Sequence, residues 1–205
     1  MLLAIDTSLG TSVAVVDAAG GILSETGTDD TMRHAEAIGE AIELALADAG
    51  VEPRRLSGVA AGMGPGPFTG LRVGIAAARA FALGIGRPVV PVLSHDAVAR
   101  AWYLGGGSGP LRVVTDARRR EFAWSAYDGL NDDGLPVRTA EPSLVPRAEL
   151  ADFAGESVEA ARVPAGSLGM VAELAYAAGR PFPADEPRYL RSPDVTLSAA
   201  KRVTR

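Results

Sequence analysis

A loop rich in glycine and proline, residues 62–70, follows a short apolar run and precedes a helical pattern. In such a position, backbone N–H groups and a helix N-terminus can hold a phosphate group. Pro65 and Pro67 remove two of the N–H donors and stiffen the loop. Because Lys201 is the only lysine of the chain, no Gly-Lys-Ser/Thr follows the loop, which excludes a Walker phosphate site and argues against a dinucleotide fingerprint.

The chain has two histidines and no cysteine, so acid–base or metal chemistry would depend on few residues. His34 and Glu36 stand at the start of an amphipathic helix, where they could form an acid–base pair, although we expect a solvent-facing or interface histidine. His95 with Asp96 beside it supplies a single imidazole, which does not make a transition-metal site.

Three consecutive arginines, residues 118–120, could bind phosphate groups. They fall in a short turn between two strand-like runs, where we expect a solvated hairpin tip instead. The net charge of −5 and the isoelectric point near 5.1 argue against broad binding of nucleic acid by the chain itself.

The first half of the chain supplies the elements that must position these residues. Its pattern predicts a three-stranded meander, an amphipathic helix and then alternating strands and helices. The expected strands are 2–5, 11–16, 22–26, 59–61 and 87–93, and the expected helices are 34–49, 70–84 and 97–104. A linker rich in glycine and serine, residues 105–110, follows and marks a lobe boundary.

The second half opens as the first one does, which predicts an internal repeat of two related lobes. Leu111–Asp116, a turn, and Glu121–Tyr127 repeat the order strand, aspartate, turn, strand. The signals after Tyr127 are weaker: they predict a strand near Leu144, a helix over 147–153, a strand near Val163, a helix over 169–178 and a proline-rich tail.

The composition predicts a folded soluble protein, which we expect in the cytoplasm. The chain is 205 residues long and 47% hydrophobic, which leaves room for one large domain or two small lobes. The absence of cysteine fits the cytoplasm. The start of the chain lacks the basic region of a signal peptide, and we expect no stretch that approaches the ~20 apolar residues of a membrane span.

Four motifs resemble the TsaB (YeaZ) family. They are Ala4-Ile-Asp-Thr-Ser8, Arg33-His-Ala-Glu36, the run from Gly62 to Gly74, and Pro187-Arg-Tyr-Leu-Arg191. The family supplies the non-catalytic dimerisation subunit of the bacterial machinery that makes threonylcarbamoyladenosine in tRNAs reading codons that begin with A. The resemblance covers nearly the whole chain and is densest over residues 1–100.

The resemblance implies an α/β fold of two lobes, actin-like and Hsp70-like (ribonuclease H-like), in which each lobe is a mixed sheet flanked by helices. Residues 1–104 would form the N-terminal lobe that carries the interface helices. Residues 105–110 would be the linker, and residues 111–205 a smaller lobe with a mobile tail.

The resemblance also implies partners and a role without chemistry of its own. The chain would bind and activate TsaD, the paralogue that transfers the threonylcarbamoyl group, and TsaE, an ATPase, would join the pair. Alone it would be a homodimer, and it would contact tRNA only indirectly. It would bind no cofactor on its own, since ATP or ADP and the metal belong to the partner subunits. In the catalytic relative two histidines four residues apart hold the metal, whereas this chain has His95 and Ala99 there.

In actin-like ATPases, acidic turns position Mg²⁺ and phosphate. The matching turns here are Asp6, Thr7 and Ser8 in the first lobe and Asp116 in the second. We interpret them as vestigial, each aspartate capping a tight turn through its side chain.

Two helices are therefore expected to form the functional surface. Helices 34–49 and 70–84 would lie side by side and present small, apolar residues to the same pair from a partner. Glycine within a helix costs about 1 kcal/mol relative to alanine, so Gly74 suggests a close contact. The expected interface residues are His34, Ala35, Ile38, Ile42, Gly70, Leu71, Gly74, Ala77, Ala78 and Phe81.

Two other functions stay open. A stand-alone actin-like ATP-dependent small-molecule kinase would use the same fold, although the short second lobe and the prolines of the 62–70 loop argue against it. A metallopeptidase, which an older glycoprotease label of the family suggests, would need the second histidine that Ala99 replaces.

Overall fold

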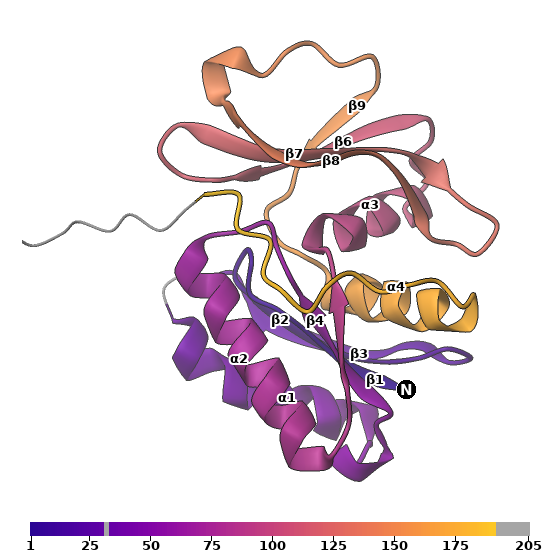
Figure 1. Ribbon diagram of the computed structural model, residues 1–205. Coiled ribbons are helices and arrows are strands. Elements are labelled where there is room, and N and C mark those ends of the chain that lie inside the picture. Colours follow the sequence, from indigo (N-terminus) through magenta and orange to yellow (C-terminus); the bar gives the residue numbers. More distant parts are fainter. Residues whose placement is uncertain (31–32, 192–205) are drawn as a thin grey trace, which may run out of the picture.

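Apolar and β-branched runs form the central sheet of the larger lobe in the computed structural model, which describes residues 1–30 and 33–191 (Figure 1). The strand order is β3-β2-β1-β4-β5. The first three strands form an antiparallel meander, and β4 and β5 continue the sheet in parallel with β1. The strands are β1 (Leu2–Asp6), β2 (Thr11–Asp17), β3 (Gly21–Thr28), β4 (Gly58–Gly62) and β5 (Val89–Val92).

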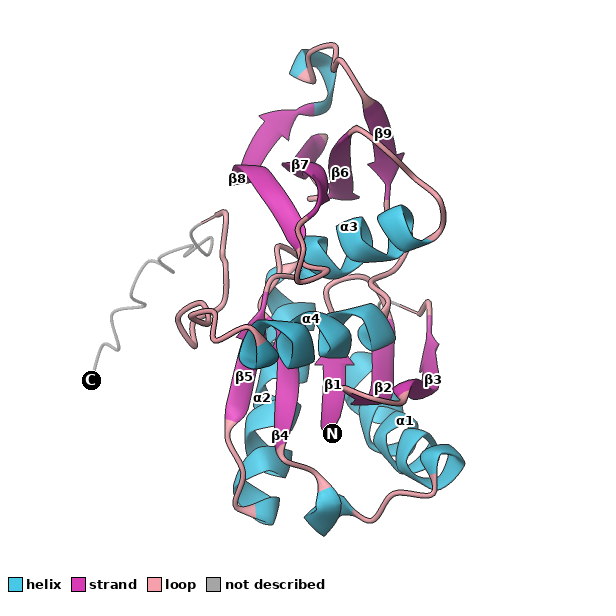
Figure 2. Cartoon of the chain, turned by 90° about the vertical axis from the view of Figure 1, so that its right-hand side faces the viewer, coloured by secondary structure: helices cyan, strands magenta, loops and turns pink. Residues whose placement is uncertain are grey.

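Helices α1 (His34–Ala49) and α2 (Phe68–Ile85) cover one face of this first sheet (Figure 2). Side chains alternate across a strand, so every second residue of β1 and β2 points toward these helices. This core includes Leu3, Ile5, Val13, Val15, Ile38, Ala45, Leu71, Ile75 and Ala78. Gly50 ends α1 in a left-handed conformation at φ 63°, as the sequence predicted.

The opposite face of the first sheet packs on α4 (Ala165–Ala177), and α3 (Ser94–Leu104) lies between α4 and the second sheet (Figures 1 and 2). This arrangement differs from the expected lobes 1–104 and 111–205, because α4 follows the second sheet in the chain but completes the first lobe. The reason is that the β1 and β2 residues on this face, such as Ala4 and Val16, are apolar and need a cover.

The second sheet repeats the plan of the first. Its order is β8-β7-β6-β9, an antiparallel meander with β9 parallel to β6. The strands are β6 (Pro110–Asp116), β7 (Glu121–Leu130), β8 (Pro136–Pro146) and β9 (Glu156–Glu159). The predicted internal repeat and the predicted fold class, two mixed sheets flanked by helices, are therefore confirmed.

Several predicted ranges in the second half were wrong in detail. The strand expected near Leu144 is confirmed, but it is part of the longer edge strand β8, whose prolines obscured its pattern and are tolerated at a sheet edge. The expected helix over 147–153 is a single 3₁₀ turn, Arg147–Glu149. Val163 is a buried loop residue, not a strand residue, and the strand before it is β9. The basic tail beyond residue 191 lies outside the described residues.

Candidate functional site

The turn after β1 is enclosed by protein hydrogen bonds. Asp6 is 1% exposed, and burial raises the pKa of its carboxyl group, an effect that its hydrogen bonds oppose. Its Oδ1 atom accepts the Ser8 backbone N–H at 2.7 Å, and its Oδ2 atom accepts the Ser94 hydroxyl at 2.5 Å. A side chain at Gly62 would overlap the same carboxylate, because its Cβ atom would lie 1.8 Å from Oδ2. The Asp6 carboxylate therefore has its hydrogen-bond partners inside the fold.

Thr7, the next residue, joins this turn to the first turns of α2. Its hydroxyl donates to the Gly70 carbonyl at 2.6 Å and accepts the Gly74 N–H at 3.0 Å. A Cβ atom at Gly74 would lie 2.2 Å from Thr7 Oγ1, and one at Gly70 would lie 2.6 Å from the Thr7 carbonyl oxygen. The close contact predicted at Gly74 exists, but it is made inside the chain and not with a partner helix.

The proline-stiffened loop between β4 and α2 is held by the start of α3. Ser94 donates its backbone N–H to the Gly64 carbonyl at 2.8 Å, and its Oγ atom accepts the Gly64 N–H at 3.1 Å. The peptide bond between Gly64 and Pro65 is cis. The two hydrogen bonds engage both backbone polar groups of Gly64 inside the protein.

Asp116 occupies the corresponding turn of the second sheet. Its Oδ1 atom accepts the Arg118 backbone N–H at 2.7 Å, which repeats the geometry of Asp6 with Ser8, and it pairs with Arg147 at 3.0 Å. Partial burial acts to raise its pKa, but the Arg118 N–H and Arg147 outweigh that effect, so the pKa is lowered. Both aspartates therefore have the turn-capping contacts that the vestigial interpretation expects.

His95 is fully buried at the junction of α3 and the second sheet. Its Nδ1 atom lies 2.8 Å from Ser125 Oγ and its Nε2 atom 3.1 Å from Thr115 Oγ1, so both ring nitrogens have partners. Burial, assisted by the charge of Arg138, lowers the pKa of the imidazole to about 3. Ala99 is also buried, and no cluster of three potential ligands from His, Asp and Glu is found in residues 1–30 and 33–191.

We expected a solvent-facing or interface histidine at His34; the side chain is 8% exposed, so the solvent-facing alternative was wrong. Its Nδ1 atom lies 3.0 Å from Thr11 Oγ1, and its ring lies beneath Gly70. It therefore connects the start of β2 to both α1 and α2. The sequence at the start of this helix did not predict the burial of His34, because its partner Thr11 lies far away in sequence.

Two cavities that Phe68 lines lie between the lobes, with volumes of about 320 and 510 Å³. Asp116 lines the smaller one together with Pro65 and Arg119. The larger one brings together four residues that the sequence singled out, with arginines from the opposite lobe. They are Ser8, His34, Ala35 and Gly70, with Arg118 and Arg119.

Residues 181–191, which the sequence predicted as part of a proline-rich tail, run from α4 past α2 to the second sheet (Figure 1). We call this segment the strap. The ring of Tyr189 lies 4.7 Å from that of Phe68, centroid to centroid, and its hydroxyl accepts a bond from Arg72 at 3.2 Å. The guanidinium of Arg72 in turn lies over the Phe68 ring.

The strap contacts both lobes. Arg79 of α2 pairs with Asp185 at 2.9 Å, and the Arg188 N–H donates to the Met63 carbonyl at 2.7 Å in the first lobe. The Arg188 side chain pairs with Glu141 of β8 at 3.2 Å in the second. The sequence signals for this segment were its prolines and the motif Pro187-Arg-Tyr-Leu-Arg191, and neither reveals its contacts.

The ten expected interface residues divide into two groups. Six are buried in the chain's own interior, where α1 and α2 pack on the first sheet and on the Thr7 turn: His34, Ile38, Gly70, Leu71, Gly74 and Ala78. Four reach the surface, Ala35 as an exposed residue and Ile42, Ala77 and Phe81 as half-buried ones. The six residues are buried because the most apolar stripe of a surface helix faces its own sheet.

Comparison with known proteins gives the family. The protein-family model described as TsaD, tRNA N6-adenosine threonylcarbamoyltransferase, matches residues 9–141. An uncharacterized protein of Mycobacterium tuberculosis is 40% identical over 182 residues, which cover 84% of this chain and 82% of that protein. The Escherichia coli tRNA threonylcarbamoyladenosine biosynthesis protein TsaB is 34% identical over 95 residues, 46% of this chain and 41% of that one.

The structure of YeaZ from Pseudomonas aeruginosa superposes with a TM-score of 0.81 at 25% identity, covering 92% of this chain and 99% of that one. A second Pseudomonas aeruginosa structure, described as similar to peptidase YEAZ, gives a TM-score of 0.79 at 26% identity, with coverage of 93% and 99%. These likenesses confirm the expected two-lobe actin-like fold. With the match of the family model, they show that the chain belongs to the TsaB (YeaZ) family.

Proposed function

We propose that this chain is a non-catalytic subunit of tRNA threonylcarbamoyladenosine biosynthesis, which binds a TsaD-type threonylcarbamoyltransferase and activates it. The similarity to Escherichia coli TsaB and the match to the family model support the pathway, since the names of both refer to this modification of tRNA. In the absence of partners, the chain would form a homodimer, which would dissociate when the complex with the TsaD-type protein forms. A TsaE-type ATPase would join that complex. ATP or ADP and the metal would be held by the partners.

The observation that carries this proposal is the surface of α2. The helix is 18 residues long and apolar enough to cross a membrane by length and composition, contrary to the expectation from sequence, yet only 33% of it is buried. In this fold it packs on a sheet, so the remaining surface is better explained by a protein partner. Its outward residues are uncharged apart from Arg72 and Arg79, which contact the strap.

The proposed partner surface is therefore revised toward the outer side of the two helices. It keeps Ala35, Ile42, Ala77 and Phe81, and it adds the exposed residues Gly39, Ala76, Ala80 and Leu83. Leu83 is 83% exposed, an unusual position for a large apolar side chain without a partner. Small neighbours around such an anchor allow helices of a second protein to approach closely.

The local geometry supports a role without catalysis by this chain. The Asp6 carboxylate is engaged by Ser8 and Ser94, and both nitrogens of His95 are engaged by hydroxyl groups. A side chain that already has its hydrogen-bond partners inside the fold is poorly placed to act as a general base toward a substrate or to bind a metal.

The experiment is size-exclusion chromatography with light scattering, applied to the chain alone and mixed with the TsaD-type protein of its own organism. Ala80→Arg places a charged side chain on the outer surface of α2 without entering the core, and should abolish the complex. Ala177→Arg, at an equally exposed position of α4, is the matched control and should leave the complex intact. If both variants still form the complex, α2 is not the interface. Gly74→Arg is unsuitable, because Gly74 is buried against Thr7.

The kinase alternative is tested on the same preparation. Tight binding of Mg²⁺-ATP by the isolated chain, measured by calorimetry, together with indifference to the TsaD-type protein, would replace the proposed function by an ATP-dependent activity.

A further inference from the structure

Helix α2 has a different neighbour on each of its sides. Its apolar stripe packs on the first sheet. Gly70 marks the side of α1, since the ring of His34 lies against it. Arg72 and Arg79, two helical turns apart, lie on the opposite margin and contact the strap. The outward side of α2 is therefore bordered by α1 on one margin and by the strap on the other.

The outward side of the two helices is too small to hold a partner alone. A specific interface takes about 20–30 residues from each protein. The proposed partner surface has eight residues, and five of them are glycine or alanine. Leu83, its large exposed side chain, comes one helical turn after Arg79 and lies on the strap's margin. A partner seated on Leu83 would therefore extend over the strap to reach the usual area.

The strap continues the surface of α2 as a fixed segment. It contains neither helix nor strand, so its contacts with the rest of the chain hold it in place. The Tyr189 ring and the Arg188 backbone N–H bind the first lobe. Asp185 pairs with Arg79, and its neighbour Glu186 is exposed. The strap thus places an exposed carboxylate near the outward side of α2, where a basic side chain of a partner can meet it.

The strap is also tied to the second lobe. The Arg188 side chain pairs with Glu141 of β8 at 3.2 Å, and Arg191 pairs with Glu121 of β7. Ion pairs between partly exposed side chains are individually weak. A partner that fixes the strap would therefore change how firmly the second lobe is held against the first.

We propose that the strap and the outward side of α2 form one continuous surface for the TsaD-type partner, and that the strap passes the seating of this partner on to the second lobe. The inference rests on the proposed function. The partner would place apolar helix residues against Leu83 and a lysine or arginine against Glu186.

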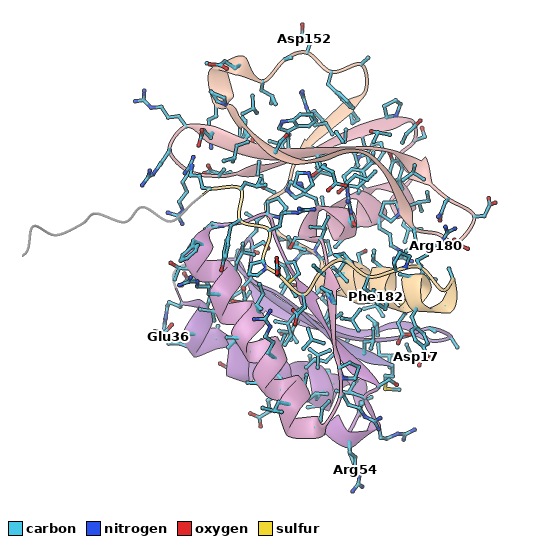
Figure 3. The ribbon with its side chains drawn as sticks, in the orientation of Figure 1. Asp17, Glu36, Arg54, Asp152, Arg180 and Phe182 are labelled. Carbon is cyan, nitrogen blue, oxygen red and sulfur yellow. The ribbon has the colours of Figure 1, made fainter. Side chains whose placement is uncertain are left out.

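Hydrogen exchange followed by mass spectrometry tests the contact. The full chain is measured in complex with the TsaD-type protein of its own organism, and alone at a concentration where light scattering finds a monomer. Backbone amides of the strap should exchange at least about tenfold more slowly in the complex. Residues 150–155, an exposed loop of the second lobe around Asp152 (Figure 3), are the internal control and should exchange equally in both states.

A charge reversal tests the chemistry of the contact. Glu186→Arg should weaken the complex by about tenfold, because it opposes a basic partner side chain with a like charge. Glu149→Arg makes the same change at an exposed position of the second lobe, and it should leave the affinity unchanged. Size-exclusion chromatography with light scattering gives the affinity of each variant.

The coupling to the second lobe is tested with spin labels. The chain has no cysteine, so labels can be attached at Arg54→Cys and Asp152→Cys before the partner is added. These positions lie at opposite ends of the molecule (Figure 3). The distribution of distances between the labels should narrow when the partner binds. With the further substitution Arg188→Gln, which removes the pair with Glu141, it should stay broad in the complex.

Three results would overturn the inference when the complex forms. The first is strap exchange that is unchanged or faster in the complex, since faster exchange would mean that the partner displaces the strap. The second is equal affinity of the Glu186→Arg and Glu149→Arg variants. The third is a distance distribution that narrows equally with and without Arg188→Gln. If the unmodified chain forms no complex, the proposed function fails as well, so the two failures are distinguishable.

Discussion

Gly74→Ala should destabilise this protein, although alanine is the best helix former and glycine among the poorest. The added Cβ atom would lie 2.2 Å from Thr7 Oγ1 and 3.0 Å from Thr7 Cγ2. Thr7 is 2% exposed, and its hydroxyl already bonds to both Gly70 and Gly74, so the side chain cannot rotate away without loss of those bonds. The helix and the β1–β2 turn must therefore separate.

The magnitude follows from three contributions. Overpacking of a tight interior contact typically costs about 1–3 kcal/mol. Loss of the buried hydrogen bonds of Thr7 costs about 1–3 kcal/mol. The helix propensity of alanine returns about 1 kcal/mol. We expect a net decrease in the free energy of unfolding of about 3 kcal/mol, within a range of roughly 1–5.

The assay is urea unfolding followed by circular dichroism. Gly84→Ala is the matched control, because it lies on the same helix and its Cβ atom would meet nothing within 4 Å. It should raise stability by up to about 1 kcal/mol. In a Thr7→Ala background, the penalty of Gly74→Ala should fall by about 1–3 kcal/mol, since the overlapping hydroxyl is gone. The reasoning is refuted if Gly74→Ala stabilises the chain as Gly84→Ala does.

Two further predictions concern His95 and the strap. The folded-state pKa of His95, about 3, lies below its unfolded value near 6.5, so its contribution to stability is complete above pH 6.5 and is lost as pH falls toward 3. Relative to His95→Gln, the unmodified chain should lose up to about 1.4 kcal/mol per pH unit in urea titrations between pH 6.5 and 4.5, and a constant difference between the two would contradict the buried neutral imidazole. Tyr189→Ala removes the ring contact with Phe68 and should release the strap. Because such a ring pair contributes about 1 kcal/mol, trypsin should cleave after Arg188 about fivefold faster in this variant. Tyr189→Phe keeps the contact with Phe68 and should be cleaved at nearly the normal rate.

Local patterns in the sequence were sufficient to predict most of the first lobe. The apolar and β-branched runs between Leu2 and Val16 and the helical period from His34 to Ala49 are short-range signals, and Gly50 ends the helix where expected. The repeated strand, aspartate and turn at Asp116 predicted the second sheet, because both aspartates cap their turns in the same way.

Contacts between residues distant in sequence could not be predicted in the same way. The period of α2 shows a small-residue stripe but not which surface requires it, and the answer, Thr7, lies on another element. His34 is buried by Thr11 and Gly70, and neither is its neighbour in sequence. In α4 the apolar residues occupy all sides of the helix, a pattern that indicates a central position but not which sheet it covers.

The return of α4 to the first sheet has a consequence for synthesis of the protein. The strands of that sheet are complete once β5 has left the ribosome, but one of their apolar faces stays uncovered until residues 165–177 emerge. A nascent chain shorter than that would expose a sheet surface prone to aggregation and would be a natural substrate for chaperones. We therefore expect the N-terminal lobe to be unstable as an independent fragment, and we expect the chain to acquire its stability only after α4 has emerged.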